Sequence, residues 1–149
     1  MPFGAFPNGG DTPGGNSVLI PYSGLLVNSD TPGDVSTFAA NEGWETITKT
    51  GNQVDPIGFA IPASRITRLD AVAPTGTSTI FTFTLFKNGN PTALTCTIDD
   101  GTAYAQGVDN NPAHAVDFVD GDRFDIQVTA TAPFESSGAF SGSISGTKT

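Results

Sequence analysis

Strict alternation of apolar and polar residues is the dominant pattern along this chain. It is clearest in FTFTLFKNGNPTALTCTI, residues 81–98. There the large apolar residues Phe81, Phe83 and Leu85 occupy every second position, and threonines stand between them. Because successive side chains of a β-strand point to opposite faces, this pattern predicts two strands that each bury one face. Asn88-Gly89 tolerates the positive φ angles of a tight turn, so a hairpin is predicted, with pairing after Pro91, which lacks an N–H.

The same alternation recurs nearer the C-terminus. After Gly121-Asp122, the apolar residues of one face are Phe124, Ile126, Val128 and Ala130. Shorter apolar runs predict further strands at residues 18–22, 25–28, 57–61, 65–73, 113–119 and 139–145, and one short helical turn is predicted at 35–44. The pattern predicts an all-β, antiparallel β-sandwich of about eight strands, in a single domain over residues 18–149.

Composition agrees with a β-sandwich and narrows the choice of partners. Only 14% of the 149 residues are charged, against about 25% in typical domains, and Thr, Ser and Gly fill the difference. The formal charge is −9, from 15 acidic and 6 basic residues. Binding to a phosphate backbone needs clustered Lys and Arg, which this chain lacks, so nucleic acid and anionic membranes are not expected as partners.

Two kinds of segment interrupt the alternating pattern. Residues 1–17, MPFGAFPNGGDTPGGNS, are rich in Gly, Pro and Asn and cannot form a core of their own. They are either a disordered tail or an arm whose aromatic residues, Phe3 and Phe6, dock on a neighbouring subunit or scaffold. Residues 29–56 and 99–112 are predicted as irregular, turn-rich stretches. Trp44, in the first of these, is either a plug over one end of the sandwich or part of a ligand-contact surface.

Reactive side chains are few, and they form no catalytic or metal-binding motif. Cys96 is the only cysteine, which excludes an internal disulfide, and it is predicted to be a small buried hydrophobe. His114 is the only histidine and is predicted at the surface or at a strand edge. The acidic pairs, Asp99-Asp100 and Asp120-Gly121-Asp122, are predicted to build turns rather than a calcium site or a pair of catalytic carboxylates. We therefore expect no enzymatic activity, no metal and no cofactor.

The sequence shows no targeting segment. Residues 1–17 lack a positively charged region followed by an apolar run, and no stretch approaches the roughly 20 apolar residues of a membrane helix. We expect synthesis in a cytoplasm and use without standard secretion.

The C-terminal half carries a sequence of elements that has a counterpart in a known family. The elements are TIFTFTLFKNGNPTALTCTI, HAVDFVDGDRFDIQVTAT and GAFSGSIS, preceded by FAIPASRITRLDAVA. Together, over roughly residues 57–145, they resemble the tumour-necrosis-factor-like jelly roll of complement globular heads. They are most similar to its bacterial and phage versions, including the C-terminal domains of collagen-like exosporium glycoproteins. The resemblance implies a jelly-roll sandwich and a homotrimer, and family members serve as structural caps, adhesins or ligand binders.

The chain lacks the family's collagen-like stalk, which favours a stand-alone head. The first expectation is a structural virion-surface protein, such as a phage capsid decoration, spike or fibre-head protein, that docks on a capsid through its N-terminal arm. The second is a receptor- or carbohydrate-binding adhesin that contacts a host-surface glycan through loop aromatics, Phe38, Trp44 and Tyr104. The third is a spore-surface or filament protein. Ile80 and Phe86, on the outer face of their strand, are the candidates for the subunit interface.

Overall fold

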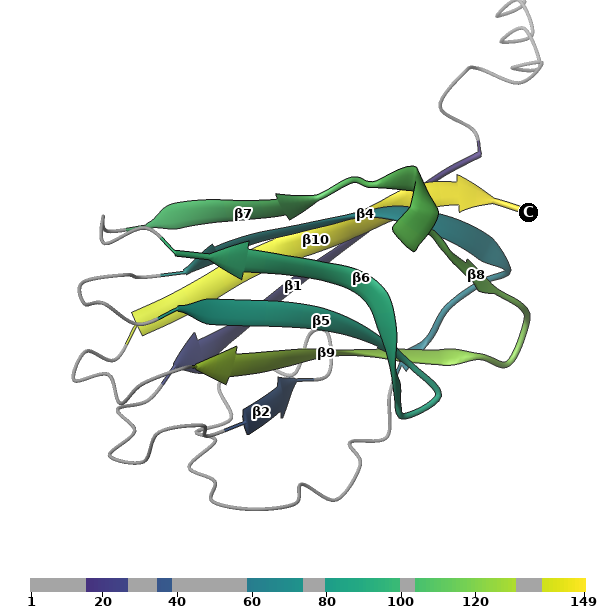
Figure 1. Cartoon of the computed structure of the whole chain (residues 1–149). Helices are drawn as coiled ribbons and strands as arrows, with labels where there is room; N and C mark the ends of the chain where they lie inside the picture. The colour runs from purple at the N-terminus through teal and green to yellow at the C-terminus, as the bar shows by residue number, and fades with distance from the viewer. Residues whose placement is uncertain (1–15, 27–34, 39–58, 74–79, 100–103, 131–137) are drawn as a thin grey trace, which may run out of the picture.

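The computed structural model is a sandwich of two antiparallel sheets, and it describes residues 16–26, 35–38, 59–73, 80–99, 104–130 and 138–149 (Figure 1). The first sheet has the strand order β1-β10-β4-β7, with β8 also paired to β4, and the second has the order β2-β9-β5-β6, with β3 also paired to β9. The bounds are β1 Ser17–Leu26, β2 Val35–Phe38, β3 Phe59–Ala60, β4 Ser64–Ala73, β5 Phe81–Lys87, β6 Asn90–Ile98, β7 Ala105–Asp109, β8 Val116–Phe118, β9 Arg123–Ala130 and β10 Gly138–Lys148.

The predicted all-β, antiparallel sandwich is confirmed. Among the described residues, eight principal strands, four in each sheet, form the sandwich, and the two-residue β3 and three-residue β8 are short additions to it. Chain neighbours are repeatedly placed in opposite sheets, as in β1 to β2, β4 to β5, β6 to β7 and β9 to β10, which is the interleaved connection pattern of a jelly roll. Every strand pair in both sheets is antiparallel.

The core lies between the sheets and is built by the alternating residues. The predicted inward set on β5 is buried, as are the inward residues of β6 and β9; the full group is Phe81, Phe83, Leu85, Leu94, Cys96, Ile98, Phe124, Ile126 and Val128. Phe83 meets Phe140 of the opposite sheet edge to face, with ring centroids 5.5 Å apart. Burial of each such side chain contributes about 1.5–3 kcal/mol, so the period-two pattern supplies most of the cohesion between the sheets.

Tyr22 and Gly142 form a close contact between neighbouring strands of the first sheet. The Tyr22 side chain is buried, its hydroxyl donates to the backbone oxygen of Asp70, and it passes over Gly142. A Cβ at Gly142 would lie 2.1 Å from that same oxygen and 2.3 Å from the hydroxyl, so only glycine fits there. Burial raises the pKa of Tyr22, and the hydroxyl remains a neutral donor.

Several local expectations were wrong. The two predicted strands at 18–22 and 25–28 are a single strand, β1, and residues 35–38 of the predicted helical turn form strand β2. The stretch 99–112, predicted as turn-rich, contains β7, and the start of the predicted strand at 113–119 is a 3₁₀ turn, η1 Pro112–His114. Pairing of the hairpin includes Asn90 and Pro91, because a register shift between Thr84 and Phe86 accommodates the proline.

Candidate functional site

The first described residues and the C-terminal residues of the chain lie side by side at one end of the sandwich, which we call the terminal pole. The backbone N–H of Lys148 donates to the carbonyl oxygen of Asn16 at 2.6 Å, and Thr149 donates to Ala63 at 3.2 Å. The hairpin turn between β5 and β6 lies at the same end of the sandwich as the C-terminus, but in the other sheet (Figure 1). Residues 1–15 therefore join the sandwich at the terminal pole.

The hairpin turn is fastened to the start of β9. Asn88 has φ 51° and Gly89 has φ 77°, the left-handed conformation that the Asn-Gly sequence predicted. The Asn88 side chain donates from Nδ2 to Asp122 Oδ1 at 2.7 Å and accepts at Oδ1 from the Arg123 N–H at 2.8 Å. Its backbone N–H also donates to the Arg123 oxygen at 2.9 Å. Three hydrogen bonds thus lock the turn against the neighbouring loop.

Asp122 links both sheets at the terminal pole. Its Oδ2 accepts from the Val119 N–H at 2.9 Å and pairs with Lys87 Nζ at 2.8 Å. Lys87 Nζ also lies over the ring of Phe118 in the opposite sheet, 5.4 Å from the ring centroid. It donates a hydrogen bond to the backbone oxygen of Asp117 as well. The hydrogen bond from Lys87, then those from Val119 and Asn88, lower the pKa of Asp122 to about 2.

The acidic turn is therefore occupied by protein donors. Asp120 Oδ1 also accepts, from the N–H of Ala63 at 3.2 Å. This agrees with the prediction that Asp120-Gly121-Asp122 builds a turn. Within the described ranges, no group of three or more His, Cys, Asp or Glu residues is arranged to hold a metal ion.

We expect low pH to weaken the contacts that Asp122 makes at the terminal pole. Because the folded pKa of Asp122 lies below its unfolded value, the stabilisation is complete above the unfolded pKa of about 4 and is lost as the pH falls towards about 2. We expect the melting temperature of the wild type to fall over this window more than that of Asp122→Asn, which keeps the hydrogen-bond acceptor without the charge. Thermal melts of both proteins between about pH 6 and pH 2 measure this difference. If the melting temperatures of the two proteins fell in parallel with pH, the ion pair between Asp122 and Lys87 would not contribute to stability.

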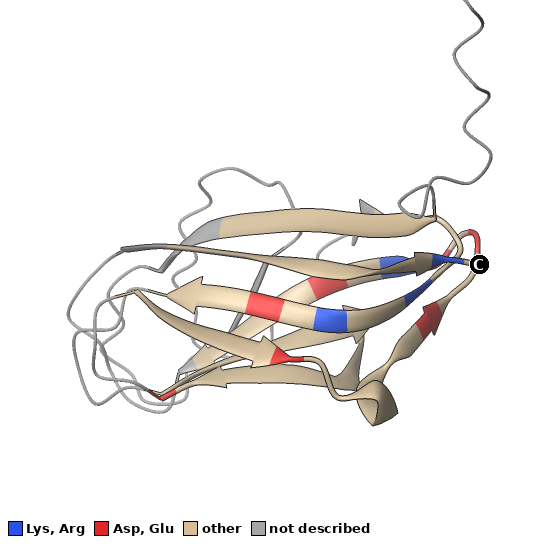
Figure 2. Cartoon of the chain, turned by 90° about the horizontal axis from the view of Figure 1, so that it is seen from above, with Lys and Arg blue, Asp and Glu red and all other residues tan. Residues whose placement is uncertain are grey.

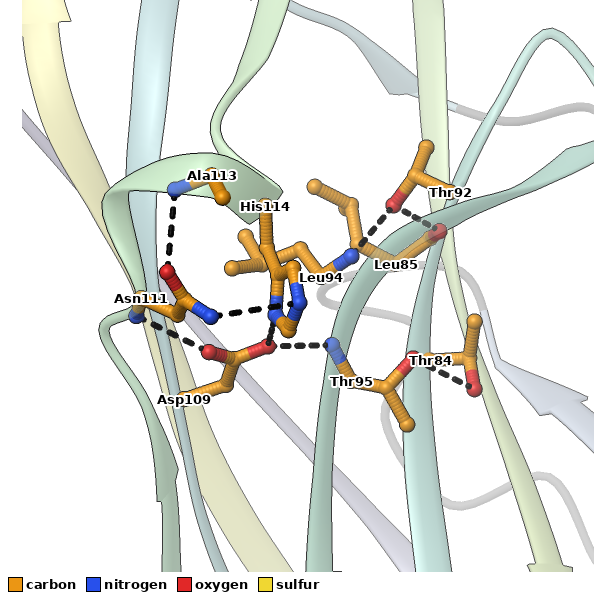
Figure 3. Close-up of polar contacts among 9 residues, drawn as sticks. All are labelled: Thr84, Leu85, Thr92, Leu94, Thr95, Asp109, Asn111, Ala113 and His114. Atoms are coloured by element: carbon orange, nitrogen blue, oxygen red, sulfur yellow. Dashed lines mark hydrogen bonds and ion pairs between the residues drawn. The ribbon is translucent and has the colours of Figure 1, made fainter.

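A second polar group, the lateral cluster, joins β6, β7 and η1 and consists of Thr95, Asp109, Asn111 and His114 (Figure 3). Asp109 is buried and accepts three hydrogen bonds: from Thr95 N–H at 2.9 Å, from Asn111 N–H at 3.0 Å and from His114 Nδ1 at 2.8 Å. Burial alone raises the pKa of Asp109, but these hydrogen bonds outweigh it and hold the pKa below its usual value.

The donors around His114 fix its tautomer. Nδ1 faces the Asp109 carboxylate, and Nε2 lies 3.4 Å from Asn111 Nδ2, which as an amide nitrogen only donates. Nδ1 is therefore the nitrogen that donates to Asp109, and both ring nitrogens have a polar neighbour. The contact between His114 and Asp109 fastens η1 to β7.

The lateral cluster also closes one long edge of the sandwich. β6 is the last strand of the second sheet, and Asp109 occupies the outward N–H of Thr95 at mid-strand. Gly107 brings β7 onto the same strand, since a Cβ there would lie 2.9 Å from Ile98 Cγ1 and 3.0 Å from the Thr97 oxygen. Because Asp109 already accepts from the Thr95 N–H, this N–H cannot pair with a further strand, which hinders strand addition at the middle of the β6 edge.

At the end opposite the terminal pole, which we call the loop pole, described strand ends gather at Leu26, Ala73, Ile98 and Ala130 (Figure 1). Tyr104 precedes β7 there, with 69% of its surface exposed and a positive φ of 60°. Of the three predicted ligand-contact aromatics, it alone has a described side chain. Trp44 and the side chain of Phe38 lie outside the described residues, as do Phe3 and Phe6 of the arm.

The predicted interface residues lie on the outer face of the second sheet. Ile80 and Phe86 are half-buried within the chain, and Phe86 stands opposite Pro91 and Asp125 in the sheet register. Between them, the outer face of β5 carries threonines.

Charge on the first sheet is arranged in opposed pairs (Figure 2). Arg68 Nε lies 2.6 Å from Asp70 Oδ2, and Arg65 lies 2.8 Å from Asp117. The described residues hold seven acidic and five basic side chains, so most of the net charge of −9 belongs to the other segments. Exposed pairs of this kind contribute little stability, but they leave the sandwich itself close to neutral.

Comparisons with protein families, with curated proteins and with solved structures found no match for this chain. None of the helical structure in the described residues is long and apolar enough to cross a bilayer.

Several of these contacts could not be seen in the sequence. Reasoning from His114 as an isolated histidine missed Asp109, although the turn signal Asp109-Asn110-Asn111-Pro112 marks a bend that returns the chain towards its own strand. Asp122 was expected to serve its own turn, and its contacts with Lys87 and Asn88, about 35 residues earlier, depend on sheet pairing.

Proposed function

We propose that this chain is a structural head protein of a virion surface, such as a phage capsid decoration, spike or fibre-head protein, that attaches through its N-terminal arm. The observation that carries the proposal is the hydrogen bond between Lys148 and Asn16, which places the junction with the arm at the terminal pole. Attachment at this pole leaves the loop pole, with Tyr104, directed outward.

The contacts at the terminal pole support an attachment there. The hairpin turn, the acidic turn and the C-terminal strand are joined there by hydrogen bonds of 2.6–3.3 Å and by the Lys87–Asp122 pair. A rigid base transmits load from an arm to both sheets, because Lys87 and Asp122 connect the two. The polar contacts of the lateral cluster hold β6, β7 and η1 together, as expected of a structural protein.

A receptor- or glycan-binding adhesin is the second candidate, and Tyr104 favours it. An exposed aromatic ring held at a positive φ is costly for a non-glycine residue and is suited to stacking against a sugar or a partner surface. This role is compatible with the first, since a head that attaches at one pole can bind a receptor at the other.

We further propose that the head is a homotrimer, as in the jelly-roll family that it resembles, with Ile80 and Phe86 at the subunit interface. Light scattering should then return three times the chain mass of 15.3 kDa. Phe86→Glu should reduce it to the monomer, whereas Ser141→Glu, at an exposed position of β10 in the other sheet, should not. A wild-type monomer at micromolar concentration would overturn the trimer.

Immunogold labelling tests the virion assignment. Antibodies raised against the sandwich should decorate the exterior of purified particles in electron micrographs. Labelling of spores or cell surfaces without labelling of particles would favour the spore-surface or filament alternative and would overturn the virion proposal.

A further inference from the structure

The hairpin turn at the terminal pole contains an Asn-Gly dipeptide, a sequence that is prone to deamidation. In an Asn-Gly sequence the backbone nitrogen that follows the asparagine is unhindered, because glycine has no side chain. That nitrogen can attack the side-chain amide carbon and form a succinimide ring. Asn88 and Gly89 are both exposed, so water and hydroxide reach the turn.

The fold holds the reacting amide in place. Asn88 Nδ2 donates to Asp122 Oδ1 at 2.7 Å, and Asn88 Oδ1 accepts from the Arg123 N–H at 2.8 Å. Rotation of the amide towards the Gly89 nitrogen breaks both bonds. The reaction is therefore coupled to opening of the turn away from Asp122 and β9.

We propose that Asn88-Gly89 is a site of spontaneous deamidation that the hydrogen bond to Asp122 keeps slow in the folded protein. When the turn opens transiently, deamidation converts that opening into a permanent chemical change. The Gly89 nitrogen forms a bond to Asn88 Cγ and gives up its proton, and the side-chain nitrogen leaves as ammonia. Water then opens the succinimide at either carbonyl and yields aspartate or isoaspartate. No oxidant, reductant or enzyme is required.

The product cannot restore the original contact. Where Asn88 Nδ2 donated to Asp122 Oδ1, the product places a carboxylate oxygen, so two acceptors of like charge face each other. Asp122 also holds Lys87 and the Val119 N–H, and the disturbance therefore reaches the link between the two sheets. An isoaspartate would in addition lengthen the backbone of a turn that has room for two residues.

Peptide mapping of aged protein measures the reaction directly. Trypsin places Asn88 in the peptide 88–123 and the other Asn-Gly pair, Asn8-Gly9, in the peptide 1–49, so the two sites are read separately. At mildly alkaline pH, Asn88 of the folded wild type should convert about tenfold or more slowly than Asn88 of the same chain in denaturant. Asp122→Ala should accelerate conversion in the folded protein, whereas Asp120→Ala, in the same turn but not bonded to Asn88, should not.

Two results would overturn the proposal. One is equal conversion of Asn88 in the folded and the denatured wild type. The other is a folded Asp122→Ala protein that converts no faster than the wild type. Should Asp122→Ala fail to fold, Asn88→Asp supplies the deciding measurement: it should melt below the wild type above about pH 4, where both carboxylates are charged, and an unchanged melting temperature would contradict the predicted repulsion.

Discussion

Replacement of Gly142 by alanine is expected to reduce the free energy of unfolding by roughly 3 kcal/mol. The added Cβ would lie 2.1 Å from the Asp70 backbone oxygen, which cannot move without disturbing the pairing of β10 with β4. It would also displace the Tyr22 hydroxyl from that oxygen. For a domain of this size the melting temperature should fall by roughly 6–12 °C, and thermal denaturation followed by circular dichroism measures it.

Two controls separate the clash from a general effect on β10. Ser141→Ala, at an exposed neighbouring position, should melt within about 2 °C of the wild type, because surface substitutions usually change stability by less than 0.5 kcal/mol. Tyr22→Phe combined with Gly142→Ala should not restore stability, since the contact with the backbone oxygen remains. Rescue by the double substitution would show that the hydroxyl, and not the backbone, limits the space.

Removal of the Asp109 carboxylate is the second large effect that we expect. Asp109→Ala leaves the Thr95 N–H, the Asn111 N–H and His114 without their acceptor, and each unsatisfied donor that stays buried costs about 1–3 kcal/mol. The variant should lose roughly 3 kcal/mol of stability, and hydrogen exchange at the Thr95 amide should accelerate because the edge of β6 opens. Chemical denaturation and amide exchange measure the two effects.

Asp117→Ala is the matched control for this prediction. Asp117 also accepts hydrogen bonds from a basic side chain, Arg65, but both side chains are about half exposed or more. Its removal should cost about 1 kcal/mol at most. If Asp109→Ala lost no more stability than Asp117→Ala, the lateral cluster would not stabilise the β6 edge.

The sheets were predictable because burial imposes a period of two. Phe81, Phe83 and Leu85 were assigned to the core from their spacing alone, and Asn88-Gly89 marked the turn through its tolerance of positive φ. Cys96 followed from the same parity, and burial, with Asp70 and Asp109 nearby, raises the pKa of its thiol to about 12. These assignments depend on residues that are close in sequence.

Contacts between distant segments were not predictable in the same way. β7 was missed because AQGVD is short and half polar, and it is a strand only through its pairing with β4. The partner that makes Gly142 indispensable, Tyr22, is 120 residues earlier in the chain and reaches it only through the pairing of β1 with β10. The polar locks of both candidate regions, at Asp109 and Asp122, depend likewise on register.

Attachment through the arm has an energetic requirement of its own. Two buried phenylalanines contribute roughly 3–6 kcal/mol, whereas ordering a glycine-rich arm costs about 1–2 kcal/mol per residue. In the proposed attachment, Phe3 and Phe6 would therefore need added backbone hydrogen bonds to the partner, and three arms of a trimer would strengthen attachment through effective concentration.

Binding of the purified head to particles stripped of it is the most direct test of arm-mediated attachment at the terminal pole. The truncation should remove residues 1–15 and keep Asn16 and Ser17, because Asn16 accepts from Lys148 and Ser17 begins β1. Full-length protein and Tyr104→Ala should bind alike, while the truncated protein and the Phe3→Ala, Phe6→Ala double variant should lose binding by about a hundredfold or more. Equal binding by truncated and full-length protein would contradict attachment through the arm.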